Sequence, residues 1–194
     1  MEDKFSRIWG DLLNRVGTST IRECSYGGAK GKEMHLVDST RIVIEFDYVS
    51  EELAKELNVE KPTSVDALYI QDGKLCLVEF KNTDKFDDSD KKKGKDYWEE
   101  VKMKIHDTLV ILQRFDYISW ADFPLIQIIV VRKFNSKDRT RVLEMQKAGK
   151  TPRLNMKLNF LQKAYQTNIF DMNPDEYKKL INTPNDSEVV VCTQ

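Results

Sequence analysis

Two carboxylates and a lysine lie at the open end of an expected hairpin in the stretch VDALYIQDGKLCLVEFKN, residues 65–82. An Asp-Gly dipeptide at residues 72–73, flanked by alternating apolar residues, is a strong indication of a two-residue β-hairpin turn. With that turn, the numbers of facing residues sum to 145, which places Asp66 opposite Glu79 with Cα atoms about 4.5 Å apart. Lys81 follows Glu79 by two residues and therefore points to the same face of the sheet.

This arrangement of charges needs an explanation, because like charges placed opposite each other destabilise a sheet and burial adds to the cost. One carboxyl group can stay protonated, Lys81 can neutralise the pair, or a bound cation can bridge the two groups. Paired carboxylate oxygens with room for water are a common way of holding Mg²⁺. If a cation such as Mg²⁺ or Mn²⁺ is the remedy, it could activate water, and Lys81 could stabilise developing negative charge.

The elements that must position these residues can be predicted from apolar periodicity. We expect strands at 41–49, 65–71, 74–82 and 124–134 and a long helix at 94–118. Shorter helices are expected at 2–16, at 50–58 with Ser50 as N-cap, at 137–150 and at 173–182, and 188–192 is a candidate edge strand. This order predicts an α/β fold with a mixed central β-sheet flanked by helices, an αβββαβ core followed by a C-terminal helical extension.

The motif Asp66, twelve intervening residues, then Glu79-Phe80-Lys81 resembles the signature of the PD-(D/E)xK nuclease superfamily, which has the restriction-endonuclease-like fold. The resemblance covers residues 1–134, and residues 135–194 are expected to pack on the same domain as a helical extension. It departs from the family pattern at Val65, where proline is frequent. The resemblance implies hydrolysis of phosphodiester bonds: Asp66 and Glu79 would bind the metal together with the backbone carbonyl of Phe80, and Lys81 would assist the attacking water.

The family often supplies a further acidic ligand from the first helix or the first strand. Glu45 and Asp47 are the candidates here because they share the polar face of the expected strand 41–49. We favour Glu45, since apolar residues flank it. An ordinary solvated strand face is the alternative for both residues.

Several residues are candidates for contacts with a nucleic-acid backbone, which basic side chains bind in a salt-dependent manner. The charged segment after Lys81, expected to be a loop, contributes three consecutive lysines, and the helix 94–118 contributes a lysine and a histidine four residues apart. Gln113 and Tyr117 fit a Gln-x-x-x-Tyr motif of some relatives, and two basic residues end the strand 124–134. The full set is Lys91, Lys92, Lys93, Lys102, His106, Gln113, Arg132 and Lys133.

Composition limits the possible partners of the 194-residue chain. The formal net charge is -1, so binding to nucleic acid would need a local basic patch. The apolar runs are too short to span a bilayer, the N-terminus lacks a secretory signal, and the three cysteines lack metal-site spacing. These features predict a cytoplasmic protein that acts on nucleic acid and not at a membrane, and a homodimer is compatible with them. The alternative function is a catalytically inactive nuclease-like fold that binds nucleic acid or protein.

Overall fold

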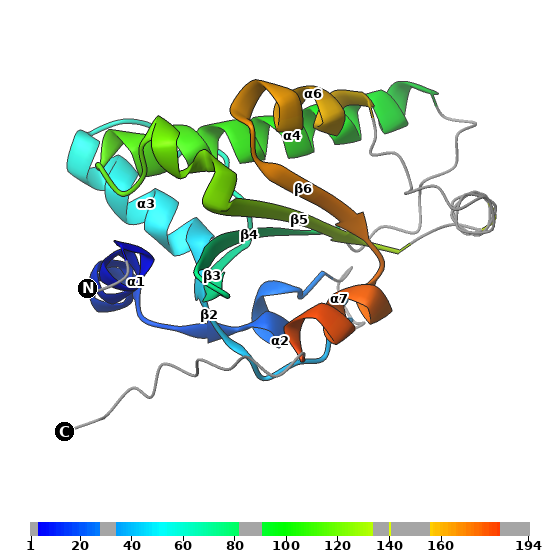
Figure 1. The fold of residues 1–194 in the computed structure, drawn as a ribbon, viewed down its shortest axis with the longest axis horizontal. Coiled ribbons are helices and arrows are strands. Elements are labelled where there is room, and N and C mark those ends of the chain that lie inside the picture. Colours follow the sequence, from blue (N-terminus) through cyan, green and yellow to red (C-terminus); the bar gives the residue numbers. More distant parts are fainter. Residues whose placement is uncertain (1–3, 28–33, 82–90, 134–139, 141–155, 183–194) are drawn as a thin grey trace.

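The computed structural model describes residues 4–27, 34–81, 91–133, 140 and 156–182, with backbone only at 91–97, 156, 157 and 159 (Figure 1). The helices are α1 (Lys4–Val16), α2 (Ile21–Cys24), α3 (Phe46–Leu57), α4 (Lys91–Arg114), the 3₁₀ helix η1 (Trp120–Leu125), α6 (Met156–Tyr165) and α7 (Pro174–Ile181). The strands are β1 (Ser19–Thr20), β2 (Ile42–Glu45), β3 (Ala67–Gln71), β4 (Lys74–Lys81), β5 (Ile126–Arg132) and β6 (Asn168–Met172).

The strands form one six-stranded mixed sheet, in which they lie side by side in chain order. The pairs β1–β2, β2–β3 and β3–β4 are antiparallel, whereas β4–β5 and β5–β6 are parallel. The parallel step from β4 to β5 requires a long crossover connection, and α4 lies in it. The predicted α/β fold with a mixed sheet is confirmed.

Helices cover both faces of the sheet, with α1, α3, α4 and α6 on one side and α2 and α7 on the other (Figure 1). Successive side chains of a strand point to opposite faces, so each central strand feeds two cores. On β5, Ile128 packs in the core under α4 and Ile129 packs in the core under α7. Coverage of both faces explains why β5 is apolar along nearly its whole length.

The β3–β4 hairpin has the predicted turn and register. Asp72 and Gly73 have φ values of 50° and 66°, as a two-residue type I′ turn requires, and the facing pairs run from Gln71↔Lys74 to Ala67↔Val78. The ladder ends there, because Asp66 lies in a bend just before β3 and donates its backbone N–H to the carbonyl of Val78 at 2.9 Å. Asp66 is therefore next to the strand rather than inside it.

The prediction for residues 41–58 was partly wrong. The strand ends at Glu45, and α3 begins at Phe46 and continues to Leu57. Ser50 is not an N-cap, because it lies buried inside α3 and donates its hydroxyl to the carbonyl of Pro62. The β-branched and aromatic residues favoured a longer strand, but Phe46, Val49 and Leu53 have helical spacing and pack in the core when this segment is helical.

Two further segments differ from the sequence-based expectation. Helix α4 begins at Lys91, so the second half of the expected charged loop is helical. The extension is not only helical, because β6 joins the edge of the sheet beside β5. The predicted helix at 137–150, apart from Thr140, and the candidate strand at 188–192 lie outside the described residues.

The predicted helices at both ends of the described chain are present. Helix α1 ends at Val16 and is followed by Gly17, where φ is +75° and the backbone N–H bonds the carbonyl of Leu13. Helix α7 has Pro174 in its first turn and Asn173 as N-cap. In the part of the chain that the structure describes, no helix combines the length and apolar character needed to cross a bilayer.

Candidate metal and phosphate site

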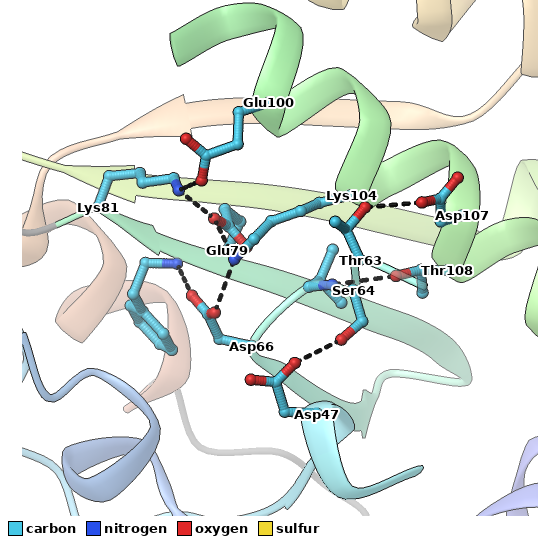
Figure 2. A network of polar contacts seen from close by, with 12 residues as sticks. Asp47, Thr63, Ser64, Asp66, Glu79, Lys81, Glu100, Lys104, Asp107 and Thr108 are labelled. Carbon is cyan, nitrogen blue, oxygen red and sulfur yellow. Dashed lines mark hydrogen bonds and ion pairs between the residues drawn. The ribbon is translucent and has the colours of Figure 1, made fainter. Parts of the chain in front are cut away.

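The predicted residues Asp66, Glu79 and Lys81 come together at the open end of the hairpin, and Lys104 of α4 joins them (Figure 2). The ammonium nitrogen of Lys104 lies 3.2 Å from Asp66 Oδ1, 2.9 Å from Glu79 Oε1 and 3.1 Å from Glu79 Oε2. The ammonium nitrogen of Lys81 lies 2.9 Å from Glu79 Oε1 and 2.6 Å from Glu100 Oε1. We call Asp66, Glu79, Lys81 and Lys104 the charged cluster.

The backbone of β4 fixes one oxygen of Asp66. Its Oδ2 accepts a hydrogen bond from the backbone N–H of Phe80 at 2.6 Å. The carboxylate thus takes the place of the backbone carbonyl that would pair with this N–H if β3 were longer. Because the N–H and C=O of a residue in an extended strand point to the same edge, the carbonyl of Phe80 is also directed past the end of β3. The predicted carbonyl ligand therefore lies on the same edge as the Asp66 carboxylate.

Three hydrogen bonds anchor the segment that leads into Asp66 (Figure 2). Thr63 donates to Asp107 Oδ2 at 2.7 Å and Ser64 donates to Asp47 Oδ1 at 2.7 Å. The buried backbone N–H of Val65 donates to the hydroxyl of Thr108 at 3.0 Å. The bend at Asp66 is thus attached to both α3 and α4.

Besides Asp107, helix α4 contacts the site and the segment before it through three side chains spaced four residues apart. Residues at that spacing lie on one face of a helix. Glu100 binds Lys81, Lys104 binds both carboxylates, and Thr108 accepts the N–H that precedes Asp66. We call Glu100, Lys104 and Thr108 the polar stripe of α4; it runs beside the apolar stripe that packs in the core.

Both acids of the cluster have raised pKa values, and that of Glu79 lies near neutrality. Its side chain is 0% exposed, and burial together with the neighbouring charge of Asp66 raises its pKa to about 7, against the opposing effect of Lys104 and Lys81. Burial also raises the pKa of Asp66, although Lys104 and the Phe80 N–H stabilise the ionised form. A carboxyl group that titrates near neutrality in a polar cluster is a common feature of functional sites.

Opposing effects act on the two ammonium groups. Burial alone would lower the pKa of Lys104, but the charges of Glu79 and Asp66 outweigh it and raise the pKa. The pKa of Lys81 is raised for the corresponding reason, with Glu79 and Glu100 outweighing burial. Both lysines therefore carry full positive charge at neutral pH.

The donor set fits a small divalent cation. Glu79 Oε1 is buried and has two ammonium nitrogens at 2.9 Å, yet neither contact has the geometry of a directed hydrogen bond. One oxygen from each carboxylate and the Phe80 carbonyl are hard ligands, and Mg²⁺ is usually bound through one or two carboxylates with water completing the shell. Among the described residues, no group of three or more His, Cys, Asp or Glu side chains forms a metal-binding cluster.

Glu45 lies beside the charged cluster but not in it. It is the last residue of β2 and faces Ala67, the neighbour of Asp66 in the chain. Burial and the nearby carboxylate of Asp47 raise its pKa, and Asp66 adds to this effect. Since β-strand neighbours share a face, Glu45 lies on the face of Ala67, which packs in the core under α7, and not on the face of Glu79.

The structure does not bring the other predicted substrate-binding residues of α4 to the charged cluster. Lys102 pairs with Glu99 at 3.7 Å, and His106 lies beside Asp107 and the ring of Tyr165. Gln113 is nine residues beyond Lys104, which is about 14 Å along a helix. Tyr117 of the Gln-x-x-x-Tyr motif lies past the end of α4 and donates its hydroxyl to Asp11 of α1.

The remaining basic candidates lie at the end of β5 and in the first turn of α4, and Lys133 is a half-buried residue directly after β5. Arg132 is buried, forms a double ion pair with Asp171 of β6 at 2.9 Å and lies over the ring of Trp98. It therefore links β5 to β6. The side chains of Lys91, Lys92 and Lys93 lie outside the described ones, although their backbone forms the first turn of α4.

Sequence reasoning missed Lys104 and the role of Glu100. The sequence feature that could have indicated them is the four-residue spacing of Glu100, Lys104 and Thr108, which places the three on one helix face beside the apolar stripe. Only the rotation of α4 against the sheet decides that Lys104, rather than Lys102, reaches the carboxylates.

No family model, curated protein or solved structure matches this chain. The functional assignment therefore depends on the residues and their geometry.

Proposed function

We propose that this protein is a metal-dependent nuclease that hydrolyses phosphodiester bonds in DNA or RNA, with the PD-(D/E)xK type of active site. The observation that carries the proposal is the meeting of Asp66, Glu79 and Lys81 at the open end of the β3–β4 hairpin. The order of α1, β2 to β4, α4 and β5 also agrees with the core that the sequence resemblance implies. We place its action in the cytoplasm.

Each residue of the site has a role that its environment supports. Asp66, Glu79 and the carbonyl of Phe80 would hold Mg²⁺ or Mn²⁺. When bound, such a cation supplies positive charge that polarises a phosphodiester and acidifies water. Lys81, held between Glu79 and Glu100, presents a fixed ammonium that stabilises negative charge developing on the phosphate.

A catalytically inactive binding protein of the same fold is the second candidate. The observation that favours it is the position of Lys104, whose ammonium already neutralises both carboxylates. In a protein that no longer binds a metal, the Lys104 ammonium would stabilise the fold by neutralising the two buried carboxylates. The two candidates differ in whether the carboxylates still bind a metal and whether nucleic acid is cut.

Cleavage assays on linear DNA, circular DNA and single-stranded RNA with Mg²⁺ or Mn²⁺ test the proposal. We expect the wild-type protein to cut at least one of them, and Glu79→Gln and Lys81→Met to lose about two orders of magnitude in rate or more, as removal of a group that stabilises the transition state does. Lys81→Met should still bind Mn²⁺, because the lysine acts on the phosphate. The proposal is rejected if all three substrates stay intact with the wild type, or if the variants cut at the wild-type rate.

A further inference from the structure

We propose that Lys104 is a built-in competitor of the divalent cation: its ammonium occupies the position between Asp66 and Glu79, so that a metal binds there only when Lys104 turns away. The inference rests on the proposed function, because it concerns the same two carboxylates. It adds a determinant of metal affinity that lies on α4, outside the Asp-Glu-Lys motif.

The geometry of the cluster makes the two cations mutually exclusive. The Lys104 nitrogen lies within 3.2 Å of three carboxylate oxygens that belong to two residues. Asp66 and Glu79 would hold Mg²⁺ through oxygens of the same two carboxylates that Lys104 now contacts. Two cations that share these oxygens in a buried site would repel each other strongly, because the low local dielectric screens them poorly.

Lys104 is the member of the cluster that can move. Glu79 belongs to a central strand and is fully buried, and Asp66 is held by the Phe80 N–H. The Lys104 side chain is 20% exposed and has a flexible four-carbon stem, so its ammonium can turn toward solvent without a change in the helix.

Lys81 does not share this role. Its ammonium has a second carboxylate partner in Glu100, which keeps it in place when the charge around Glu79 changes. The partners described for the Lys104 ammonium are Asp66 and Glu79 alone. Metal binding would therefore release Lys104 and retain Lys81.

Isothermal titration of the full chain with MnCl₂ alone, without nucleic acid, tests the inference. We expect Lys104→Met to bind Mn²⁺ about tenfold more tightly than the wild type or better, an energy difference that calorimetry resolves readily. Lys104→Arg, which keeps the charge, should bind no more tightly than the wild type. Lys102→Met, which removes one charge from the same helix away from the cluster, should match the wild type.

Three outcomes of the titration would contradict the proposed role of Lys104. Equal Mn²⁺ affinity of Lys104→Met and the wild type, with binding abolished by Asp66→Asn, would overturn the role of Lys104 and leave the metal site intact. Equal tightening by Lys102→Met would also overturn it, since net charge alone would then be responsible. Absence of binding in both the wild type and Lys104→Met would reject the metal site itself, and with it the proposed function.

Folding of the variant is checked separately, because removal of Lys104 leaves two adjacent carboxylates without their counter-ion. If Lys104→Met is unfolded in metal-free buffer, circular dichroism with added MnCl₂ replaces the titration. Recovery of the wild-type spectrum supports the inference. A spectrum that does not respond to Mn²⁺, while Lys104→Arg stays folded, overturns it.

Discussion

The buried carboxyl group of Glu79 determines how the charged cluster responds to pH. Its pKa is about 7 in the folded chain, above the value of 4.5 expected when it is exposed by unfolding. The native state therefore holds a proton that the unfolded state has released between these two values, and stability falls as pH rises through that window. Asp66, whose pKa is also raised, acts in the same direction.

We accordingly expect the free energy of unfolding in metal-free buffer to decrease from pH 4.5 to pH 7. Glu79→Gln, which mimics the protonated acid, should flatten this slope. Urea denaturation at several pH values measures it, and Glu100→Gln is the control because it leaves Glu79 intact. A slope that is the same in Glu79→Gln and the wild type would assign the pH dependence to other groups.

That Asp66 lies near Glu79 and Lys81 could be predicted from the sequence because the hairpin brings them together by local rules, although the ladder ends at Ala67↔Val78 and Asp66 does not itself pair with Glu79. The Asp-Gly turn sets the register, and the two-residue period of a strand sets the face. The contact with Lys104 could not be predicted in that way. It depends on how α4 is rotated against the sheet, which is a property of packing between distant segments.

At the level of single elements, α4 acts as the support of the site through its polar stripe. Thr108 accepts the buried N–H of Val65, the residue that precedes Asp66. Thr108→Val keeps the shape but leaves this donor without its partner, at a cost of about 1–3 kcal/mol. We also expect a weaker Mn²⁺ response, because the bend that carries Asp66 would be less well fixed.

The matched control for this prediction is Thr63→Val, the same substitution at another of the hydrogen bonds that anchor the segment before Asp66. Thr63 bonds Asp107 near the surface, so water can replace the lost partner. Chemical denaturation of both variants gives the comparison. Similar losses of stability in the two variants would contradict the assigned role of Thr108.

The hairpin turn is the second element on which the site depends. Gly73 has φ of +66°, and no atom lies within 4 Å of the position that a Cβ would occupy. Gly73→Val should therefore cost about 1–2 kcal/mol through backbone strain alone. Asp72→Asn, at the neighbouring position with φ of 50°, should be close to neutral because Asn tolerates this conformation. Equal urea midpoints for Gly73→Val and the wild type would argue against the turn.

The elements that sequence analysis assigned incorrectly have a common physical cause. Residues 46–49 are strand-forming by composition, and their helical state is decided by the core they enter. Strand β6 is short, and its pairing with β5 gives it its structure. The helical spacing of Phe46, Val49 and Leu53 competes with the strand preference of residues 46–49, and the core decides between the two. By contrast, the long apolar strand β5 and the helix α4 were predicted with only small errors in their bounds.

At the scale of the whole molecule, the C-terminal extension is part of the central sheet and of both cores. Strand β6 pairs with β5, and Tyr177 of α7 is buried against Phe80, the residue between Glu79 and Lys81. Leu158 and Leu161 of α6 belong to the core on the other face. Removing the extension would thus expose apolar surface on both faces of the sheet.

We therefore expect that a fragment ending at residue 134 does not fold stably, although it contains the whole Asp-Glu-Lys motif. Its thermal melt should show no cooperative transition. Loss of several buried side chains, each worth roughly 1.5–3 kcal/mol, exceeds the usual margin of stability. A fragment that ends at residue 182 keeps every described element and serves as the control. Thermal melts by near-UV circular dichroism that coincide for both fragments would show that residues 1–134 are an independent domain.

The most direct measurement of the central claim is the anomalous difference density of a crystal soaked in MnCl₂. We predict a peak bounded by Asp66, Glu79 and the carbonyl of Phe80, with the Lys104 side chain turned away and Lys81 still bound to Glu100. Density for Lys104 in its present position, with no peak between the two carboxylates at a saturating Mn²⁺ concentration, would contradict the account.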